Sequence, residues 1–125
     1  MKKLSTILLG FAMFFLASCS GSETYRGAWK AMDKEGEKFE LVFKSKSFSV
    51  KDSLGVVKQL NYKQTRITIE NGIKTYGITL KDGRSYEINF PKANDESIGL
   101  IKDENGTPIY TICRKEFTKF EDILN

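Results

Sequence analysis

Hydrophobic and polar residues alternate with a period of two along most of the chain after Tyr25. In stretches of this kind one face of a β-strand packs on a core while the other face meets water. The segments 56–62 and 65–70 form either two strands or one bent strand. The pattern predicts eight or nine strands, near residues 26–33, 37–45, 47–52, 56–62, 65–70, 73–81, 84–90, 97–103 and 107–115.

Short turns separate the predicted strands. Asn71-Gly72, Asp82-Gly83 and Asn105-Gly106 are pairs that favour positive φ at both central positions of a type I′ hairpin turn. Loops at 34–36 and 52–55 carry glycine where a strained backbone is expected. No helical segment between strands is long enough for a parallel crossover, so the strands form an antiparallel up-and-down meander. A meander of this length removes its exposed edges by closing, which predicts an all-β fold, a small closed β-barrel.

The C-terminal tail departs from the two-residue period. Phe117, Phe120, Ile123 and Leu124 recur at helical spacing. This spacing predicts a short amphipathic helix within residues 116–124 that plugs or flanks one end of the barrel.

A third pattern occupies the N-terminus. Lys2 and Lys3 precede a nearly continuous apolar run, which ends at Leu16-Ala17-Ser18-Cys19. A basic start, a short apolar run and small residues at its end are typical of a secretory signal, and the run is shorter than the about 20 residues that span a bilayer. The sequence therefore predicts a signal peptide at 1–18, a flexible linker at 19–24 and a β-barrel domain at 25–125.

The tetrapeptide that ends at Cys19 resembles the lipobox of bacterial lipoproteins. This resemblance implies cleavage before Cys19, attachment of lipid, palmitate included, to Cys19, and anchoring in a membrane through that lipid. Ser20, rather than aspartate, follows the cysteine, which implies the outer membrane. Only Glu23 is acidic in the linker, and this favours the periplasm-facing side.

Composition narrows the functional classes. The formal net charge of +4 falls to +2 once Lys2 and Lys3 leave with the signal, and acidic and basic residues are interleaved, so no nucleic-acid partner is expected. The chain has no histidine, the commonest general base and zinc ligand. With Cys19 lipidated, Cys113 has no disulfide partner and is expected to be a small buried hydrophobe. We therefore expect no enzyme activity, no metal and no cofactor.

Gly27-Ala28-Trp29, at the start of the first predicted strand, resembles the Gly-x-Trp opening of lipocalins and the wider calycin group. The resemblance implies a lipocalin-like barrel in which Trp29 closes the floor and an arginine at the end of the last strand packs across it. Arg114 is the matching residue, and Gly27 allows the close approach. The alternative for Trp29 is simple core packing, and both interpretations bury it. The chain is short for this family, so any cavity should be small.

Aromatic residues on the strand faces are the candidates for lining a cavity. An eight-stranded barrel is just wide enough either to be filled by its side chains or to hold one small ligand, and the regular spacing favours the filled core. Tyr76 and Tyr86 are expected to line the interior. The full set of candidates is Phe39, Phe43, Tyr62, Tyr76, Tyr86, Phe90 and Tyr110. In a predicted loop, Asp52-Ser53-Leu54 resembles an O-glycosylation sequon of some Gram-negative envelopes, with Ser53 as the acceptor.

Two functions fit these observations. The first is a non-enzymatic outer-membrane lipoprotein whose barrel binds a small apolar or amphipathic ligand in the cell envelope. The second is a protein-interaction module with a filled core, such as an accessory subunit of an envelope or secretion machine, or an inhibitor of a hydrolase. An internal void favours the first, and a filled barrel with an exposed apolar patch favours the second.

Overall fold

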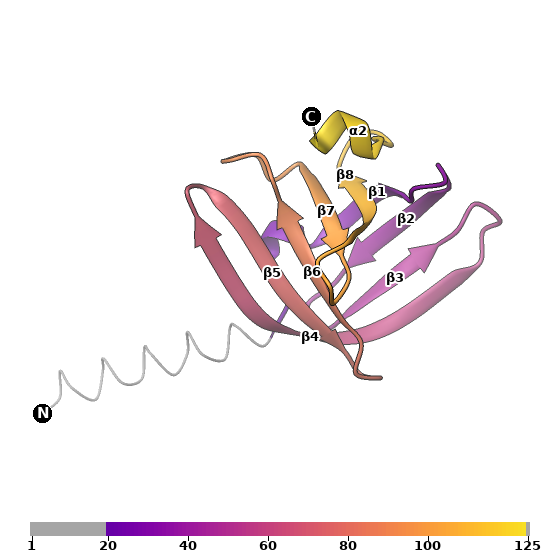
Figure 1. Ribbon diagram of the computed structural model, residues 1–125. Coiled ribbons are helices and arrows are strands. Elements are labelled where there is room, and N and C mark those ends of the chain that lie inside the picture. The colour runs from indigo at the N-terminus through magenta and orange to yellow at the C-terminus, as the bar shows by residue number, and fades with distance from the viewer. Residues whose placement is uncertain (1–19, 125) are drawn as a thin grey trace, which may run out of the picture.

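Eight antiparallel strands close into a barrel in the computed structural model, which describes residues 20–124 (Figure 1). The strands are β1 (Gly27–Met32), β2 (Lys38–Phe43), β3 (Ser47–Lys51), β4 (Val57–Glu70), β5 (Ile73–Leu80), β6 (Ser85–Phe90), β7 (Ile98–Lys102) and β8 (Pro108–Cys113). Each strand pairs with the next, and β8 pairs back to β1 with Ala31 opposite Ile112. The predicted all-β meander that closes into a barrel is thus confirmed. The predicted signal peptide and Cys19 lie outside the described residues.

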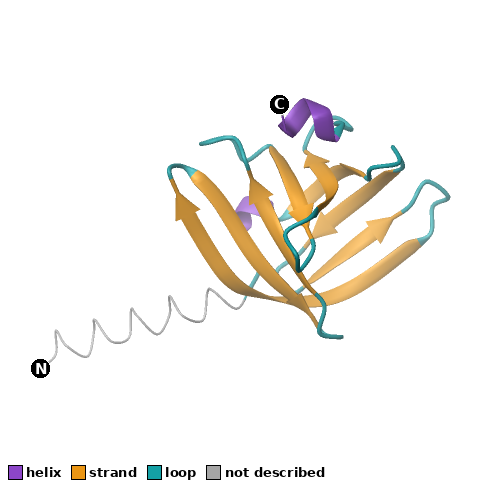
Figure 2. Ribbon diagram, viewed as in Figure 1, coloured by secondary structure: helices purple, strands orange, loops and turns teal. Residues whose placement is uncertain are grey.

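The segments 56–62 and 65–70 belong to one bent strand, β4, which curves across the barrel in Figure 2. Its first half pairs with β3 and its second half with β5. The register shifts between Gln64 and Arg66, which marks a bulge at Thr65. A bulge bends a strand and increases its twist, and this explains the break in the alternation.

The hairpin between β4 and β5 has the predicted type I′ turn. Asn71 has a φ of 53° and Gly72 a φ of 79°, so both central residues are in the left-handed region. Because only glycine and asparagine adopt this conformation readily, the turn fixes the register of the two longest strands.

Three other hairpins share a different turn, which begins with an aspartate. The carboxylate accepts hydrogen bonds from the backbone N–H groups of the second and fourth residues after it, at 2.9 to 3.0 Å. The three aspartates are Asp33, Asp52 and Asp103. In each of these turns the glycine alone has a positive φ, whereas a type I′ turn needs two consecutive residues with positive φ. The type I′ prediction for Asn105-Gly106 is therefore wrong. It is also wrong for Asp82-Gly83, where Gly83 alone has positive φ.

The two ends of the barrel carry different connections. The β1–β2, β3–β4, β5–β6 and β7–β8 hairpins lie at one end, which we call the mouth. The β2–β3, β4–β5 and β6–β7 connections lie at the other end, which we call the floor. The residues that precede β1 also lie at the floor, since Gly21 N–H donates to the carbonyl oxygen of Ser45 in the β2–β3 turn.

The C-terminal tail flanks the barrel instead of plugging it. The predicted short helix is confirmed as α2 (Phe120–Leu124), which contacts β8 from outside (Figure 1). Thr111 donates a hydrogen bond to the carbonyl oxygen of Thr118, which ties the tail to the strand. Beneath the tail a second cluster is buried apart from the barrel core: Met32, Leu100, Thr111, Cys113 and Ile123.

The eight strands of the closed barrel and the buried residues of its core and of this outer cluster all lie within residues 20–124. The two helices of this stretch are the 3₁₀ turn η1 (Glu23–Tyr25) and α2. Neither has the length and apolar character needed to cross a membrane.

Candidate functional site

The segment before β1 closes the floor of the barrel. Its turn η1 places Tyr25 inside, where it is fully buried. The Tyr25 hydroxyl donates to Gln64 Oε1 at 2.7 Å, and the same oxygen accepts the Ser22 N–H at 3.0 Å. Trp29 Nε1 in turn donates to the carbonyl oxygen of Tyr25 at 2.8 Å. These bonds satisfy the buried polar groups and fix the segment across the barrel.

Aromatic rings fill the floor half of the interior. The Tyr25 ring meets the rings of Phe43 and Tyr76 edge-on, at centroid distances of 5.4 and 5.1 Å. The Tyr62 ring lies 6.4 Å from that of Tyr25, and Phe90 packs between Trp29 and Tyr76. Burial raises the pKa of both the Tyr25 and the Tyr62 hydroxyls above the ordinary value of 10.0.

Three of the predicted cavity residues belong to this filled half. Tyr62, Tyr76 and Phe90 are at most 4 % exposed but do not line the cavity that the barrel contains. The physical reason is that Tyr25 enters the barrel from outside the strand pattern and packs against Tyr62 and Tyr76, while Phe90 packs against Trp29 and Tyr76.

Arg114 lies across the indole of Trp29. Its guanidinium carbon is 3.7 Å from the ring centroid, a favourable cation–π geometry. The guanidinium also donates to the carbonyl oxygens of Ala28 (3.0 Å), Arg26 (2.7 Å) and Thr24 (3.2 Å), and burial lowers the pKa of Arg114. These contacts join the end of the last strand to the segment that forms the floor.

Gly27 makes room for this arginine. Its φ of +99° is one that other residues rarely adopt, and a Cβ atom there would lie 3.1 Å from Arg114 Nη1. The structure therefore brings together Gly27, Trp29 and Arg114, the three residues that the sequence assigned to a barrel floor.

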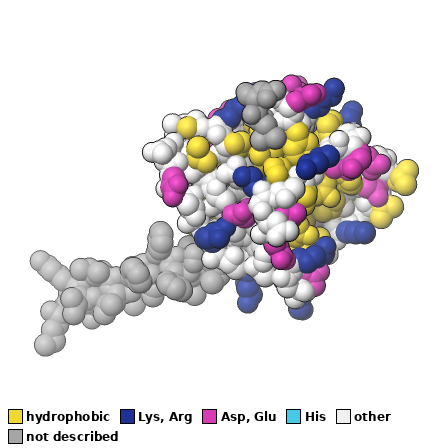
Figure 3. Space-filling model, viewed as in Figure 1, with side chains coloured by type: hydrophobic (Ala, Val, Ile, Leu, Met, Phe, Trp, Pro, Cys, Tyr) yellow, Lys and Arg dark blue, Asp and Glu magenta, His cyan; other side chains and the backbone are white. Residues whose placement is uncertain are grey.

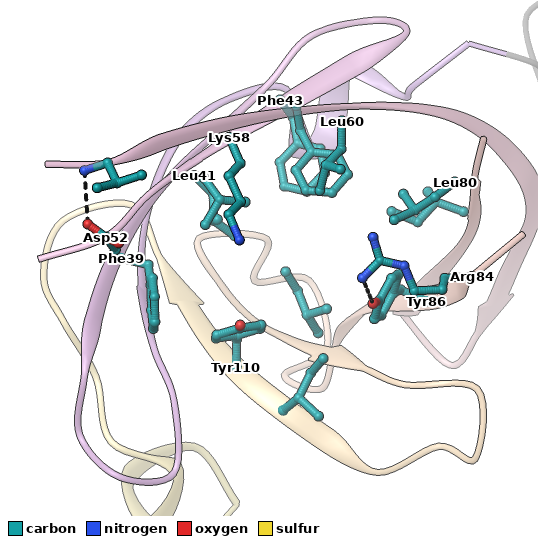
Figure 4. Close-up of a pocket in the computed structure, with 16 residues that line it drawn as sticks. Phe39, Leu41, Phe43, Asp52, Lys58, Leu60, Leu80, Arg84, Tyr86 and Tyr110 are labelled. Carbon is teal, nitrogen blue, oxygen red and sulfur yellow. Dashed lines mark hydrogen bonds between the residues drawn. The ribbon is translucent and has the colours of Figure 1, made fainter. Parts of the chain in front are cut away.

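The mouth half of the barrel is hollow. A cavity of about 280 Å³ opens there, and Figure 4 shows the side chains that surround it. Its base is formed by the stacked rings of Phe43 and Phe48, whose centroids are 5.0 Å apart. The remaining apolar lining residues are Phe39, Leu41, Val50, Val56, Leu60, Ile78, Leu80, Tyr86, Ile101, Ile109 and Tyr110. Four of the predicted aromatic residues thus line the cavity: Phe39, Phe43, Tyr86 and Tyr110. The sequence favoured a filled core, and this prediction is right only for the floor half of the barrel.

Charged groups ring the entrance of this apolar cavity. Lys58 extends from β4 over the cavity, and Arg84 extends over it from the opposite side (Figure 4). Arg84 bonds to Asp82 at 2.8 Å and donates to the Tyr86 hydroxyl at 3.4 Å. Asp52 is the one acidic residue among those that line the cavity. The site can therefore hold an apolar group inside and a polar group at the mouth.

No known family model, curated protein or solved structure matches this chain. Within residues 20–124, no three His, Cys, Asp or Glu side chains gather in a way that would hold a metal ion.

The β3–β4 hairpin projects beside the cavity mouth with apolar residues at its tip. Leu54 is 87 % exposed, and Val56 and Val57 are more than half exposed. Figure 3 shows hydrophobic side chains at the right-hand edge of the molecule, where the β3–β4 hairpin ends in the same view of Figure 1. Ser53, the predicted glycosylation acceptor, is exposed at the same tip, and Asp52 of that sequon holds the turn through Leu54 N–H.

Sequence reasoning missed four residues of this site. Tyr25 and Gln64 form the polar link at the floor, and nothing in the two-residue alternation distinguishes them. Lys58 and Arg84 did carry a signal, because they occupy the same parity as the inward residues Leu60 and Tyr86 of their strands. Neither was among the candidates, because only aromatic residues were considered for lining the cavity.

Proposed function

We propose that this chain is a lipid-anchored envelope lipoprotein whose lipocalin-like barrel binds one small apolar or amphipathic molecule. The observation that carries the ligand-binding part is the cavity of about 280 Å³, open at one end and walled by aromatic and aliphatic side chains. Ligand pockets have this character, with predominantly apolar linings and a few polar groups that fix orientation.

The floor supports the same proposal. Arg114 stacked on Trp29, with Gly27 beside them, is the arrangement that the Gly-x-Trp resemblance implies. The hydrogen bonds of Tyr25 and Gln64 make the filled half rigid, so the cavity above it is preformed. A preformed cavity avoids the entropic cost of ordering its walls when a ligand binds.

The location rests on Leu16-Ala17-Ser18-Cys19, with lipid on Cys19 and an outer-membrane, periplasm-facing site. Cys19→Ala in the full chain, expressed in a Gram-negative host, should move the protein from the membrane fraction to the periplasmic extract. Wild-type protein with the mass of the polypeptide alone, or an alanine variant that stays in the membrane fraction after its signal is removed, would refute the anchor.

Ligand binding is tested with N-phenyl-1-naphthylamine, an uncharged dye whose fluorescence rises in apolar surroundings, added to residues 20–125. Val50 faces the cavity, whereas Val42 is exposed on the outer face of β2. Val50→Phe fills the cavity and should weaken dye binding at least about fivefold, while the matched Val42→Phe should leave it unchanged. Absence of saturable dye binding to the wild type would overturn the ligand-binding proposal.

A protein-interaction role is the second candidate, favoured by the exposed Leu54 at the tip of the β3–β4 hairpin. Native mass spectrometry of the lipoprotein, extracted gently from its own envelope, separates the two roles. A reproducible small-molecule adduct supports the carrier, whereas a bare chain that retains a stoichiometric protein partner supports the interaction module.

A further inference from the structure

Lys58 occupies a position where the strand pattern calls for an apolar residue. On β4 it shares the inward face with Leu60 and Tyr62, and in the barrel it lies opposite Val50 of β3. Leu60 and Val50 both line the cavity. The side chain of Lys58 extends towards the centre of the cavity in Figure 4. Lys58 is exposed, so water solvates its ammonium, and a partner of opposite charge would add a charge-assisted hydrogen bond at the edge of the cavity.

The described part of the chain does not supply that partner. The cations that form salt bridges within residues 20–124 are Lys51, Arg66, Lys74 and Arg84, and Lys58 is not among them. Asp52 also lines the cavity, but its Oδ1 accepts the backbone N–H groups of Leu54 and Val56. Asp52 Oδ1 is thus held in the hairpin turn, and no salt bridge among residues 20–124 engages the Lys58 ammonium.

A second set of donors faces Lys58 across the cavity. Arg84 continues the inward face of β6, and its guanidinium reaches the Tyr86 hydroxyl while it stays paired with Asp82. The Tyr110 side chain reaches the cavity from β8 (Figure 4), and burial raises the pKa of its hydroxyl, which stays protonated as a donor at neutral pH. Hydrogen-bond donors therefore outnumber acceptors around the entrance.

We propose that the cavity takes a single-chain amphiphile with an anionic head, whose tail lies against Phe43 and Phe48 and whose acid group binds Lys58 at the mouth. Arg84 and Tyr110 complete the site for the head. This inference rests on the proposed ligand-binding function and names its ligand class. At about 280 Å³ the cavity is near the lower end of the range for ligand sites, which suits one short chain and excludes two-chain lipids.

Three probes with ten-carbon tails test the charge of the head: decanoate, decanol and decyltrimethylammonium. Each displaces N-phenyl-1-naphthylamine from residues 20–125, so a single assay gives three affinities. Decanoate should bind about tenfold more tightly than decanol, because a charge-assisted hydrogen bond adds to the same tail contacts, and the ammonium compound should bind most weakly. Raising the salt concentration should weaken decanoate and leave decanol unchanged, since the mouth is exposed to solvent.

Lys58→Gln removes the charge and keeps most of the side-chain length. It should weaken decanoate about tenfold and change decanol less than about twofold. The matched control is Lys63→Gln, because Lys63 is equally exposed but lies on the outer face of the same strand and does not line the cavity. Arg84→Gln should have a smaller effect on decanoate than Lys58→Gln, because Arg84 already pairs with Asp82.

The outcomes separate the two proposals. If decanol binds as tightly as decanoate, or if the Lys58 and Lys63 variants behave alike, the anionic head is wrong while the carrier function stands. If decyl phosphate binds more tightly than decanoate with the same dependence on Lys58, the site still takes an anion, and phosphate is the preferred head. If neither the dye nor any ten-carbon probe binds, the carrier function fails and this inference fails with it.

Discussion

Replacing Arg114 with methionine removes the guanidinium that joins the last strand to the barrel floor and keeps a side chain of comparable length. In the structure this group stacks on Trp29 and donates to the carbonyl oxygens of Thr24, Arg26 and Ala28. The variant therefore loses one cation–π contact and three charge-assisted hydrogen bonds, while the apolar floor beneath keeps its packing.

The cost of this change can be worked from those contacts. A hydrogen bond to a charged group contributes about 1.5–3 kcal/mol when it is desolvated, and a partly exposed cation–π contact about 1 kcal/mol. Arg114 is only partly buried, so water replaces some of the lost bonds to its three acceptors. We expect the free energy of unfolding to fall by about 3 kcal/mol, which for a domain of this size lowers Tm by roughly 10–20 °C.

Chemical denaturation of residues 20–125, followed by tryptophan fluorescence, measures this change, because Trp29 is the only tryptophan in the chain. Arg114→Lys should recover less than half of the loss, since one ammonium cannot serve three carbonyls and a ring at once. Arg66→Met is the control, because Arg66 forms an exposed ion pair with Glu87 on the outer face and should cost under about 1 kcal/mol. If Arg114→Lys were as stable as wild type, or Arg114→Met no worse than Arg66→Met, this account of the floor would be refuted.

Two further predictions concern the filled half of the barrel. Because burial raises the pKa of Tyr25 above the ordinary 10.0, its stabilising contribution is complete below about pH 10 and declines by about 1.4 kcal/mol per pH unit above it. Tyr25→Phe should therefore flatten the alkaline branch of stability against pH, and parallel curves for the two proteins would contradict this. A Cβ at Gly99 would lie 3.0 Å from the carbonyl oxygen of Asn89 and 3.1 Å from the Phe90 ring, so Gly99→Ala should destabilise by about 1–3 kcal/mol in urea. An unchanged unfolding midpoint would show that β6 and β7 can move apart at Gly99 and make room for the methyl group.

The strands could be predicted because alternation reports directly on which face is buried. Phe39, Leu41 and Phe43 alternate with exposed Glu40 and Val42 in the sequence, and the barrel interior repeats that order. The break at Thr65 could not be resolved in the same way. A bulge and a turn both interrupt the alternation, and only the pairing of β4 with two neighbours in succession distinguishes them.

The cavity could not be predicted, because alternation says which residues face inward but not how much space they leave. That space depends on Tyr25, a residue outside every strand, whose position is set by its neighbour Trp29 and by Gln64, 39 residues further along the chain. For the same reason the role of Lys58 could not be predicted from the sequence. Its parity is inward, but a charge is normally assigned to solvent, and only the closed barrel shows that its position faces a cavity.

The arrangement of floor and mouth gives the proposed anchor a direction. Gly21, which follows Cys19 by two residues, donates a hydrogen bond to the carbonyl oxygen of Ser45 at the floor. A lipid on Cys19 would therefore hold the floor towards the membrane and point the mouth away from it. A ligand would then reach the cavity from the aqueous side and not from the anchoring bilayer. In this proposal Lys58, exposed at that entrance, would attract an anionic amphiphile from water before its tail is buried. In this proposal the tether at one end and the charge at the other would serve a single task, the capture of a dissolved molecule next to a membrane.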